Sequence, residues 1–355
     1  MPQLKGNREM VRIGIAGLGF MGRIHFLAYR AVNGAQVAAV SSRDVAKLAG
    51  NWSNTRGNFG PEPGRVDLTG ITPYADYTAM LRDPAIDLVD LCTPNHLHAD
   101  AAIQALEAGK HVLVEKAIAL TIADADRMVS AAAAAGRMLM VAHVLPFFPE
   151  FAFAAEAVRS GRYGKLLGAH FKRIIAQPTW SADFADADKS GGPAVDLHIH
   201  DTHFIGLIAG IPQRVHSFGR ILGNAVNYLT THYDYGAGGP VVTCSSGAIA
   251  AGRPFVHGYE IYLEQATLAY DSAGIPVTVY AADGTSHQPT LPGDGDPVAA
   301  FTCELQAAVD AVVAGREEPL LSGTLARNAL AMCLKECESV KLGKPVEVGV
   351  HGRVE

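Results

Sequence analysis

A glycine-rich segment near the start of the chain constrains the fold more than any other feature. Residues 17–22 read GLGFMG and directly follow the apolar run of residues 11–16. In a G-x-G-x-x-G pattern the first glycine permits a tight turn, the second lets a pyrophosphate approach the backbone, and the third lets the following helix pack closely on the strand. Because a strand is expected before the glycines and a helix after them, the context favours a dinucleotide-binding turn over a turn with no ligand.

Strand and helix patterns alternate through the first 145 residues. Strands separated by helices at this spacing predict βαβ units and therefore a doubly wound, parallel sheet. The polar, glycine- and proline-containing stretch 51–70 is expected to be a loop or insertion. The strand-like runs are 37–40, 86–91, 111–114 and 138–142, and the helical ones are 77–82, 99–108 and 121–135.

The pattern changes in the remaining chain, where strand-like runs follow one another with few helices between them. Several of these runs alternate polar and apolar residues, which predicts a large, mostly antiparallel sheet with one face packed and one face open. We therefore expect a dinucleotide domain at 1–145 and a second domain at 146–355, with the last helices able to pack back on the first. The strand-like runs are 166–172, 215–219, 227–235, 241–249, 259–270 and 275–280, and the helical ones are 297–314 and 324–341.

Composition narrows the class of protein. The 355 residues are 49% hydrophobic and 18% charged, which argues for packed cores and against disorder, and a chain of this length favours two domains. A net charge of −6 gives no general attraction to nucleic acid or anionic membranes. The five cysteines form no CxxC pair, and the first ten residues lack an apolar signal segment. We expect a cytoplasmic protein with free thiols.

Three loops should meet at the edge of the first sheet where ligands bind in open α/β folds. They contain Ser42 and Arg43, the segment CTPNHLH at residues 92–98, and Glu115 with Lys116. An arginine after the second strand suits the 2′-phosphate of NADP, whereas a carboxylate suits the ribose of NAD. Arg43 therefore favours NADP slightly, and Asp44, one residue later, leaves NAD open.

Two further groups of residues suggest proton-transfer chemistry. Lys116 stands at the end of a buried strand, where burial of a charged amine costs free energy unless the amine is paired or functional. The alternative is a side chain that reaches to the surface. If a helix begins at Pro193, Asp196 and His200 share one face and are able to take a proton from a hydroxyl. A zinc site with His198 and His203, or plain helix surface, is the less favoured reading because His198 lies off that face.

These motifs, in this order, resemble the Gfo/Idh/MocA oxidoreductase family, which includes inositol and sugar dehydrogenases. The resemblance rests on GLGFMG, CTPNHLH, the Glu115–Lys116 dipeptide and the GGPAVDLHIHD segment, and it spans nearly the whole chain. It implies an N-terminal Rossmann domain with NAD or NADP, and a C-terminal α/β domain whose large open sheet is often used for dimer or tetramer contacts. It also implies a small sugar or polyol substrate, with neither nucleic acid nor membrane as partner.

The resemblance assigns roles residue by residue. Lys116 matches the lysine of the family's EKP motif, and Asp196 and His200 match its D-x-x-x-H pair. Two positions depart from the pattern: Ala117 replaces the EKP proline, so the turn that proline provides is not assured. Residues 145–149 (LPFFP) lack the arginine that many relatives carry there, which favours a substrate without an anionic group at that place or one with a ring to stack.

The expected reaction is hydride transfer between a nicotinamide and a secondary alcohol of a sugar, glycoside or cyclitol. His200 would be the general base, Lys116 would donate to the alkoxide oxygen, and Asp196 would position them, with no metal. An NAD-dependent glycoside-cleaving enzyme and a non-catalytic dinucleotide-binding regulator are the alternatives. Residues expected at the cofactor are Gly17, Gly19, Phe20, Met21, Gly22, Ser42, Arg43, Thr93, Pro94, Asn95, His98, Glu115 and Lys116, and those expected at the substrate are His143, Phe147, Arg173 and Trp180.

Overall fold

The computed structural model describes residues 10–55, 57, 59–177, 186–250, 252, 254–293, 295–296 and 298–349. The chain divides into two compact units, and it passes between them more than once. Each unit contains one sheet, so the predicted combination of a parallel sheet with a mostly antiparallel one is confirmed. The first unit comprises Met1–Ile118, Ala123–Ala142 and Gly295–Gly323, and the second comprises Ala119–Ile122, His143–Asp294 and Thr324–Glu355.

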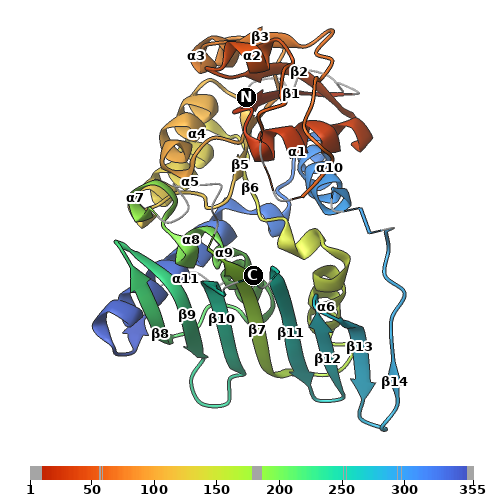
Figure 1. Ribbon diagram of the computed structural model, residues 1–355, viewed down its shortest axis with the longest axis vertical. Coiled ribbons are helices and arrows are strands. Elements are labelled where there is room, and N and C mark those ends of the chain that lie inside the picture. The colour runs from red at the N-terminus through yellow and green to blue at the C-terminus, as the bar shows by residue number, and fades with distance from the viewer. Residues whose placement is uncertain are drawn as a thin grey trace. The chain divides into compact units, whose positions relative to one another are not determined.

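The sheet of the first unit has six parallel strands in the order β3-β2-β1-β4-β5-β6 (Figure 1). The chain order reverses between β1 and β4, and it is outside the carboxyl ends of such a pair that open α/β sheets bind ligands. The central strands are apolar and buried because helices cover both faces of a parallel sheet. The strands are β1 (Val11–Ala16), β2 (Ala35–Ser41), β3 (Thr72–Tyr74), β4 (Leu88–Leu91), β5 (His111–Glu115) and β6 (Leu139–Ala142).

Helices surround this sheet, and their ends follow local sequence signals. The late helix α10 packs on α1 within the first unit and ends at Gly315, whose φ of +63° places it in the left-handed region that glycine tolerates. In the loop at 51–70, Trp52 is fully buried, and its ring centroid lies 4.9 Å from that of Phe26. The helices are α1 (Phe20–Ala28), η1 (Tyr29–Ala31), α2 (Val45–Leu48), α3 (Tyr77–Leu81), η2 (Asn95–Leu97), α4 (His98–Glu107), α5 (Ile122–Ala135), α10 (Ala299–Ala314) and η5 (Pro319–Leu321).

The sheet of the second unit has nine strands in the order β14-β13-β12-β11-β7-β10-β9-β8-β15 (Figure 1). All neighbours are antiparallel except β7 and β10. The strand-like run 259–270 contains two strands, because the chain turns back at Glu264 and Gln265. The strands are β7 (Leu166–Ala176), β8 (Arg214–Leu222), β9 (Ala225–Asp234), β10 (Val241–Ala250), β11 (Val256–Leu263), β12 (Ala266–Asp271), β13 (Ile275–Ala281), β14 (Ser286–His287) and β15 (Val346–Glu347).

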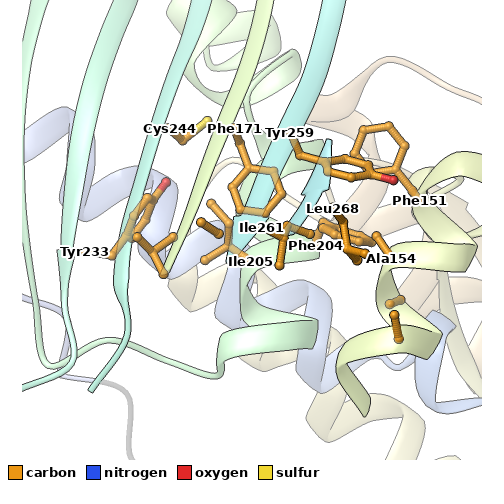
Figure 2. Close-up of a cluster of buried hydrophobic side chains, with 14 of the residues drawn as sticks. Phe151, Ala154, Phe171, Phe204, Ile205, Tyr233, Cys244, Tyr259, Ile261 and Leu268 are labelled. Carbon is orange, nitrogen blue, oxygen red and sulfur yellow. The ribbon is translucent and has the colours of Figure 1, made fainter. Parts of the chain in front are cut away.

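Helices cover one face of this sheet and form the core of the unit with it. Figure 2 shows Phe151 of α6 and Phe204 of α9 beside Phe171 and Ile261 of the sheet. Each fully buried side chain of this size contributes roughly 1.5–3 kcal/mol. The helices are η3 (Leu145–Phe147), α6 (Pro149–Arg159), α7 (Ala187–Ser190), α8 (Pro193–Asp196), α9 (Ile199–Ala209) and α11 (Gly323–Leu342).

The opposite face of the nine-stranded sheet carries exposed apolar and aromatic side chains. The strand register places Phe218, Val241 and Tyr280 on this face, and all three are exposed. Across the described ranges of the chain, every helix is too short or too polar to cross a membrane.

Candidate cofactor and active site

The three glycines of the GLGFMG loop face different surroundings. A Cβ atom on Gly22 would lie 1.9 Å from the Gly17 carbonyl oxygen, and one on Gly17, whose φ is +95°, would lie 2.5 Å from the Cys92 carbonyl oxygen. A Cβ on Gly19 would meet no atom of the described residues within 4 Å. Gly19 is also the N-cap of α1 and offers no side chain to bond the first amides of that helix. The loop therefore leaves open space over free N–H groups, as a bound pyrophosphate requires.

The loop after β2 presents one free cation. The carboxylate of Asp44 accepts hydrogen bonds from the amides of Ala46 (2.9 Å) and Lys47 (3.3 Å) and so caps α2. Arg43 is exposed, and no group in the described parts of the chain is bonded to its guanidinium. Lys47 donates to the Leu18 carbonyl at 2.7 Å and ties α2 to the glycine loop.

The loops that follow β4 and β5 are joined through one buried histidine. His98 Nδ1 lies 2.8 Å from the Ala117 carbonyl oxygen, and Nε2 lies 2.8 Å from that of Thr93. Lys116 is half-buried beside this contact, and its peptide bond to Ala117 is cis although the residue is not proline. Glu115, the last residue of β5, accepts the Lys116 amide at 3.1 Å.

Charged side chains lie inside the first unit, close to these strand ends. His25 Nδ1 is 2.9 Å from Asp90 Oδ2, and His25 Nε2 is 3.1 Å from Glu115 Oε1. Burial opposes a charged ring, but the Asp90 carboxylate and Cys92 outweigh it, so the pKa of His25 is well above its ordinary value. Burial, with Glu115 and Asp90 nearby, raises the pKa of Glu304 well above its usual range.

In the second unit the expected helix through Asp196 and His200 is broken. Helix α8 ends at Asp196 and α9 begins at Ile199, so the prediction of one unbroken helix through both residues is wrong. The cause is a wide turn in which the His198 amide bonds the Pro193 carbonyl, five residues earlier, at 3.2 Å. Asp196 and His200 are both half-buried.

The neighbouring histidines, His198 and His203, make contacts with other buried side chains. His198 is fully buried and paired with Glu336, and this carboxylate overcomes the effect of burial and raises the pKa of the ring. His203 is buried and stacks flat on His143, with ring centroids 4.0 Å apart, and burial lowers the pKa of His203 to about 3. His203 is therefore neutral at physiological pH.

The residues expected at the substrate have mixed surroundings. The Arg173 guanidinium is buried and binds Asp201 through two bonds of 2.8 and 3.1 Å, so its charge is already compensated. His143 is buried in its stack with His203, and Phe147 is half-buried in η3. Trp180 lies outside the described residues.

Sequence profiles of known families decide the family of this chain. Residues 11–143 match the profile described as the Gfo/Idh/MocA oxidoreductase family with an NAD-binding Rossmann fold, and residues 151–269 match the Gfo/Idh/MocA C-terminal domain. The chain belongs to the Gfo/Idh/MocA oxidoreductase family. The resemblance read from the motifs is thus confirmed.

Individual members of the Gfo/Idh/MocA family share moderate identity with the chain. The levoglucosan dehydrogenase of Pseudarthrobacter phenanthrenivorans is 33% identical over 49% of this chain and 43% of its own length. The scyllo-inositol 2-dehydrogenase (NAD(+)) of Bacillus subtilis is 26% identical over 96% of this chain and 97% of its own. For most of the curated relatives it matches, the chain spans about half of their length. A levoglucosan dehydrogenase structure with NADH and levoglucosan has the same fold, with a TM-score of 0.82 at 21% identity, covering 96% of this chain and all of that one.

Several residues of this Gfo/Idh/MocA chain that make contacts near the candidate site were not predicted from the sequence. His25, Lys47 and Glu304 carry the contacts described above, yet none stands in a motif that was singled out. A signal was present for the first: Asp90 and Glu115 are acids in otherwise apolar strands, which is rare without a partner. His25 stands three residues after the last glycine of the loop and supplies that partner.

Two buried groups in the described residues bring together atoms of the kind that bind metals. They are His25 with Asp90 and Cys92, and His198 with Asp201 and Cys244. In the first group the carboxylate is bonded to His25, and in the second to the Arg173 guanidinium. These contacts favour ion pairs over a metal ion at both places.

Proposed function

We propose that this protein transfers a hydride between a nicotinamide dinucleotide and a secondary alcohol or ketone of a sugar, glycoside or cyclitol. The observation that carries the proposal is the open space over Gly19 at the start of α1, on the sheet edge from which Lys116 also emerges. The relatives named as levoglucosan and scyllo-inositol dehydrogenases support this substrate class.

We assign roles in cofactor binding and proton transfer to the following residues. When bound, the nicotinamide supplies or accepts the hydride. Gly17, Gly19 and Gly22 would hold the pyrophosphate, with Phe20, Met21 and the loop Thr93–Asn95 around the rest of the cofactor. His200 would accept the proton of the substrate hydroxyl, because imidazoles titrate near neutral pH. The Lys116 ammonium would stabilise charge on the same oxygen, with Asp196 positioning the substrate.

We further propose that NADP is the slightly preferred cofactor. The Asp44 carboxylate is bonded to the amides of its own helix, whereas the Arg43 guanidinium is exposed and available to a 2′-phosphate. Relatives of known structure have been solved with NADH or NAD+, so NAD is the competing outcome of the test.

The open face of the nine-stranded sheet supports a homo-oligomer. Phe218, Val241 and Tyr280 expose apolar surface that a second copy would bury. The five cysteines are free thiols, which supports a reducing, cytoplasmic location.

The deciding experiment is a screen of sugars, inositols and glycosides with NAD+ and NADP+ in parallel, following the absorbance of the reduced nicotinamide. Lys116→Ala and His200→Ala are expected still to bind cofactor and to lose at least about 100-fold in kcat. Near-normal turnover in either variant would remove its assigned role. Release of an aglycone without net reduction would favour the glycoside-cleaving alternative, and tight cofactor binding without turnover would favour a regulator.

A further inference from the structure

His98 occupies an unusual position between two backbone carbonyls. Its ring is fully buried, and both ring nitrogens lie 2.8 Å from carbonyl oxygens, those of Ala117 and Thr93. Carbonyl oxygens only accept hydrogen bonds, so each contact requires an N–H on the ring. The imidazolium makes both bonds, whereas each neutral tautomer makes one. His98 therefore cannot offer a ring nitrogen to a cofactor while it holds these carbonyls.

Burial and hydrogen bonding act on this ring in opposite directions. Burial lowers the pKa of His98, while the Ala117 and Thr93 carbonyls and the Glu115 carboxylate counteract part of that decrease. The net shift is downward, so the neutral ring is favoured and the two bonds compete for one proton. The two contacts are thus separable, one on each ring nitrogen.

The two carbonyls belong to the segments that matter for the proposed chemistry. Thr93 precedes Pro94 and Asn95 in the loop after β4, and Ala117 directly follows Lys116 in the turn after β5. Strands β4 and β5 are neighbours in the sheet. A single side chain therefore contacts both the expected cofactor loop and the lysine turn, through one ring nitrogen each.

We propose that His98 is a positioning residue that holds the Lys116 turn through Nδ1 and the cofactor loop through Nε2. The proposal rests on the proposed function of Lys116. A purely structural alternative exists, because His98 is also the first residue of α4 and its burial alone contributes to stability.

Two conservative substitutions separate the two contacts. The amide nitrogen of asparagine falls near the position of Nδ1, and that of glutamine falls near the position of Nε2. His98→Asn therefore keeps the bond to Ala117, and His98→Gln keeps the bond to Thr93. A third variant, His111→Asn, serves as the control, since His111 stands at the opposite end of β5, where its ring accepts the Met138 amide.

The experiment measures the dissociation constants of NADP+ and NAD+ by calorimetric titration, and the reactivity of Lys116 by reductive methylation followed by NMR. His98→Asn is expected to weaken cofactor binding about 10-fold, the equivalent of one hydrogen bond, with the Lys116 signal unchanged. His98→Gln is expected to shift the Lys116 signal and to lower kcat, with cofactor binding within about 2-fold of wild type. His111→Asn is expected to change neither.

Equal losses in both His98 variants, or a change in melting temperature alone, would reduce His98 to a structural residue and overturn the proposal. Neither the titration nor the NMR signal requires a known substrate. If no alcohol is oxidised in the screen but the two variants still separate, the proposed reaction fails while the role of His98 stands.

Discussion

His25 Nδ1 lies 2.9 Å from Asp90 Oδ2, and both side chains are completely buried in the first unit. The same ring approaches Glu115 on its other side, so one imidazole faces two carboxylates from adjacent strands. A charge pair in such surroundings is costly to break, because the remaining charge stays buried without compensation.

Replacing His25 should therefore destabilise the first unit in a pH-dependent way. His25→Gln leaves Asp90 and Glu115 without their cation, and we expect a loss of about 3–5 kcal/mol in the free energy of unfolding. Because the folded pKa of His25 lies well above its ordinary value, its contribution is full below about pH 6.5 and is lost as pH rises through the folded pKa. Urea unfolding across this range should show the difference from wild type shrinking on the alkaline side. His232→Gln, on the exposed sheet face, should show no such trend.

Glu304 should show the same direction of pH dependence as His25, but its replacement should stabilise the fold at neutral pH where that of His25 destabilises it. Its folded pKa is raised well above the ordinary value, so protonation stabilises the fold at low pH and stability falls as pH rises above about 4.5. Glu304→Gln removes the ionisable group and should be more stable than wild type at neutral pH, by up to about 1.4 kcal/mol for each pH unit crossed. Near pH 4 the two proteins should unfold alike. Glu317, an exposed glutamate just after α10, provides the control. An equal gain in stability from Glu317→Gln would contradict the assignment of the effect to Glu304.

The glycine loop allows a matched pair of substitutions. Gly19→Ala introduces a methyl group that, among the residues the structure describes, meets no atom within 4 Å, at a φ of −77°, so the fold should keep its stability within about 0.5 kcal/mol. The same methyl group stands where a pyrophosphate would lie, and the cofactor dissociation constant should rise at least about 10-fold. Gly22→Ala places a Cβ atom 1.9 Å from the Gly17 carbonyl oxygen and should cost more than about 3 kcal/mol. Unchanged cofactor binding in Gly19→Ala would argue against the site.

Cofactor choice should depend on the exposed guanidinium after β2. Arg43→Ala is expected to raise the KM for NADP+ about 10-fold and to leave the KM for NAD+ nearly unchanged, because only NADP+ carries the 2′-phosphate. Ser42→Asp should shift the preference toward NAD+ by placing a carboxylate near the ribose. A wild-type enzyme that already favours NAD+ and ignores Arg43→Ala would reverse the proposed preference.

The ion pair inside the second unit should be far more important than a surface pair of the same kind. Asp201→Asn leaves the Arg173 guanidinium buried without its carboxylate, and we expect a loss of about 3–5 kcal/mol. Asp124→Asn removes a carboxylate from Arg127 on an exposed helix and should leave the melting temperature unchanged. Thermal unfolding of both variants measures the contrast. Similar melting temperatures would show that the buried ion pair contributes no more to stability than the exposed one.

Much of the fold follows from local patterns. The run Val11–Ala16 and the glycines after it predict β1, the turn and α1, and β4, β5 and α4 fall within two residues of their expected places. Local patterns fail where the backbone changes direction without a strong signal. The turn at Glu264 and Gln265 divides an apolar run, and the wide turn at His198 divides an expected helix.

The candidate site divides in the same way. Gly17 and Gly22 were recognisable because the turn of a βαβ unit requires glycine at their positions. Lys116 was recognisable because a charged side chain is costly at the end of a buried strand. His98 was expected from its motif as a cofactor residue, but its two carbonyl contacts came only from the folded chain. His25 was missed because its partners are distant in sequence.

The sequence by itself determined the parallel sheet with its glycine turn and the open sheet that follows, since apolar periodicity and glycine placement act over a few residues. Only the tertiary structure decided which buried charges meet. Asp90 and Glu115 lie 65 and 90 residues from His25, and the cost of burying each charge alone is what brings these three side chains together.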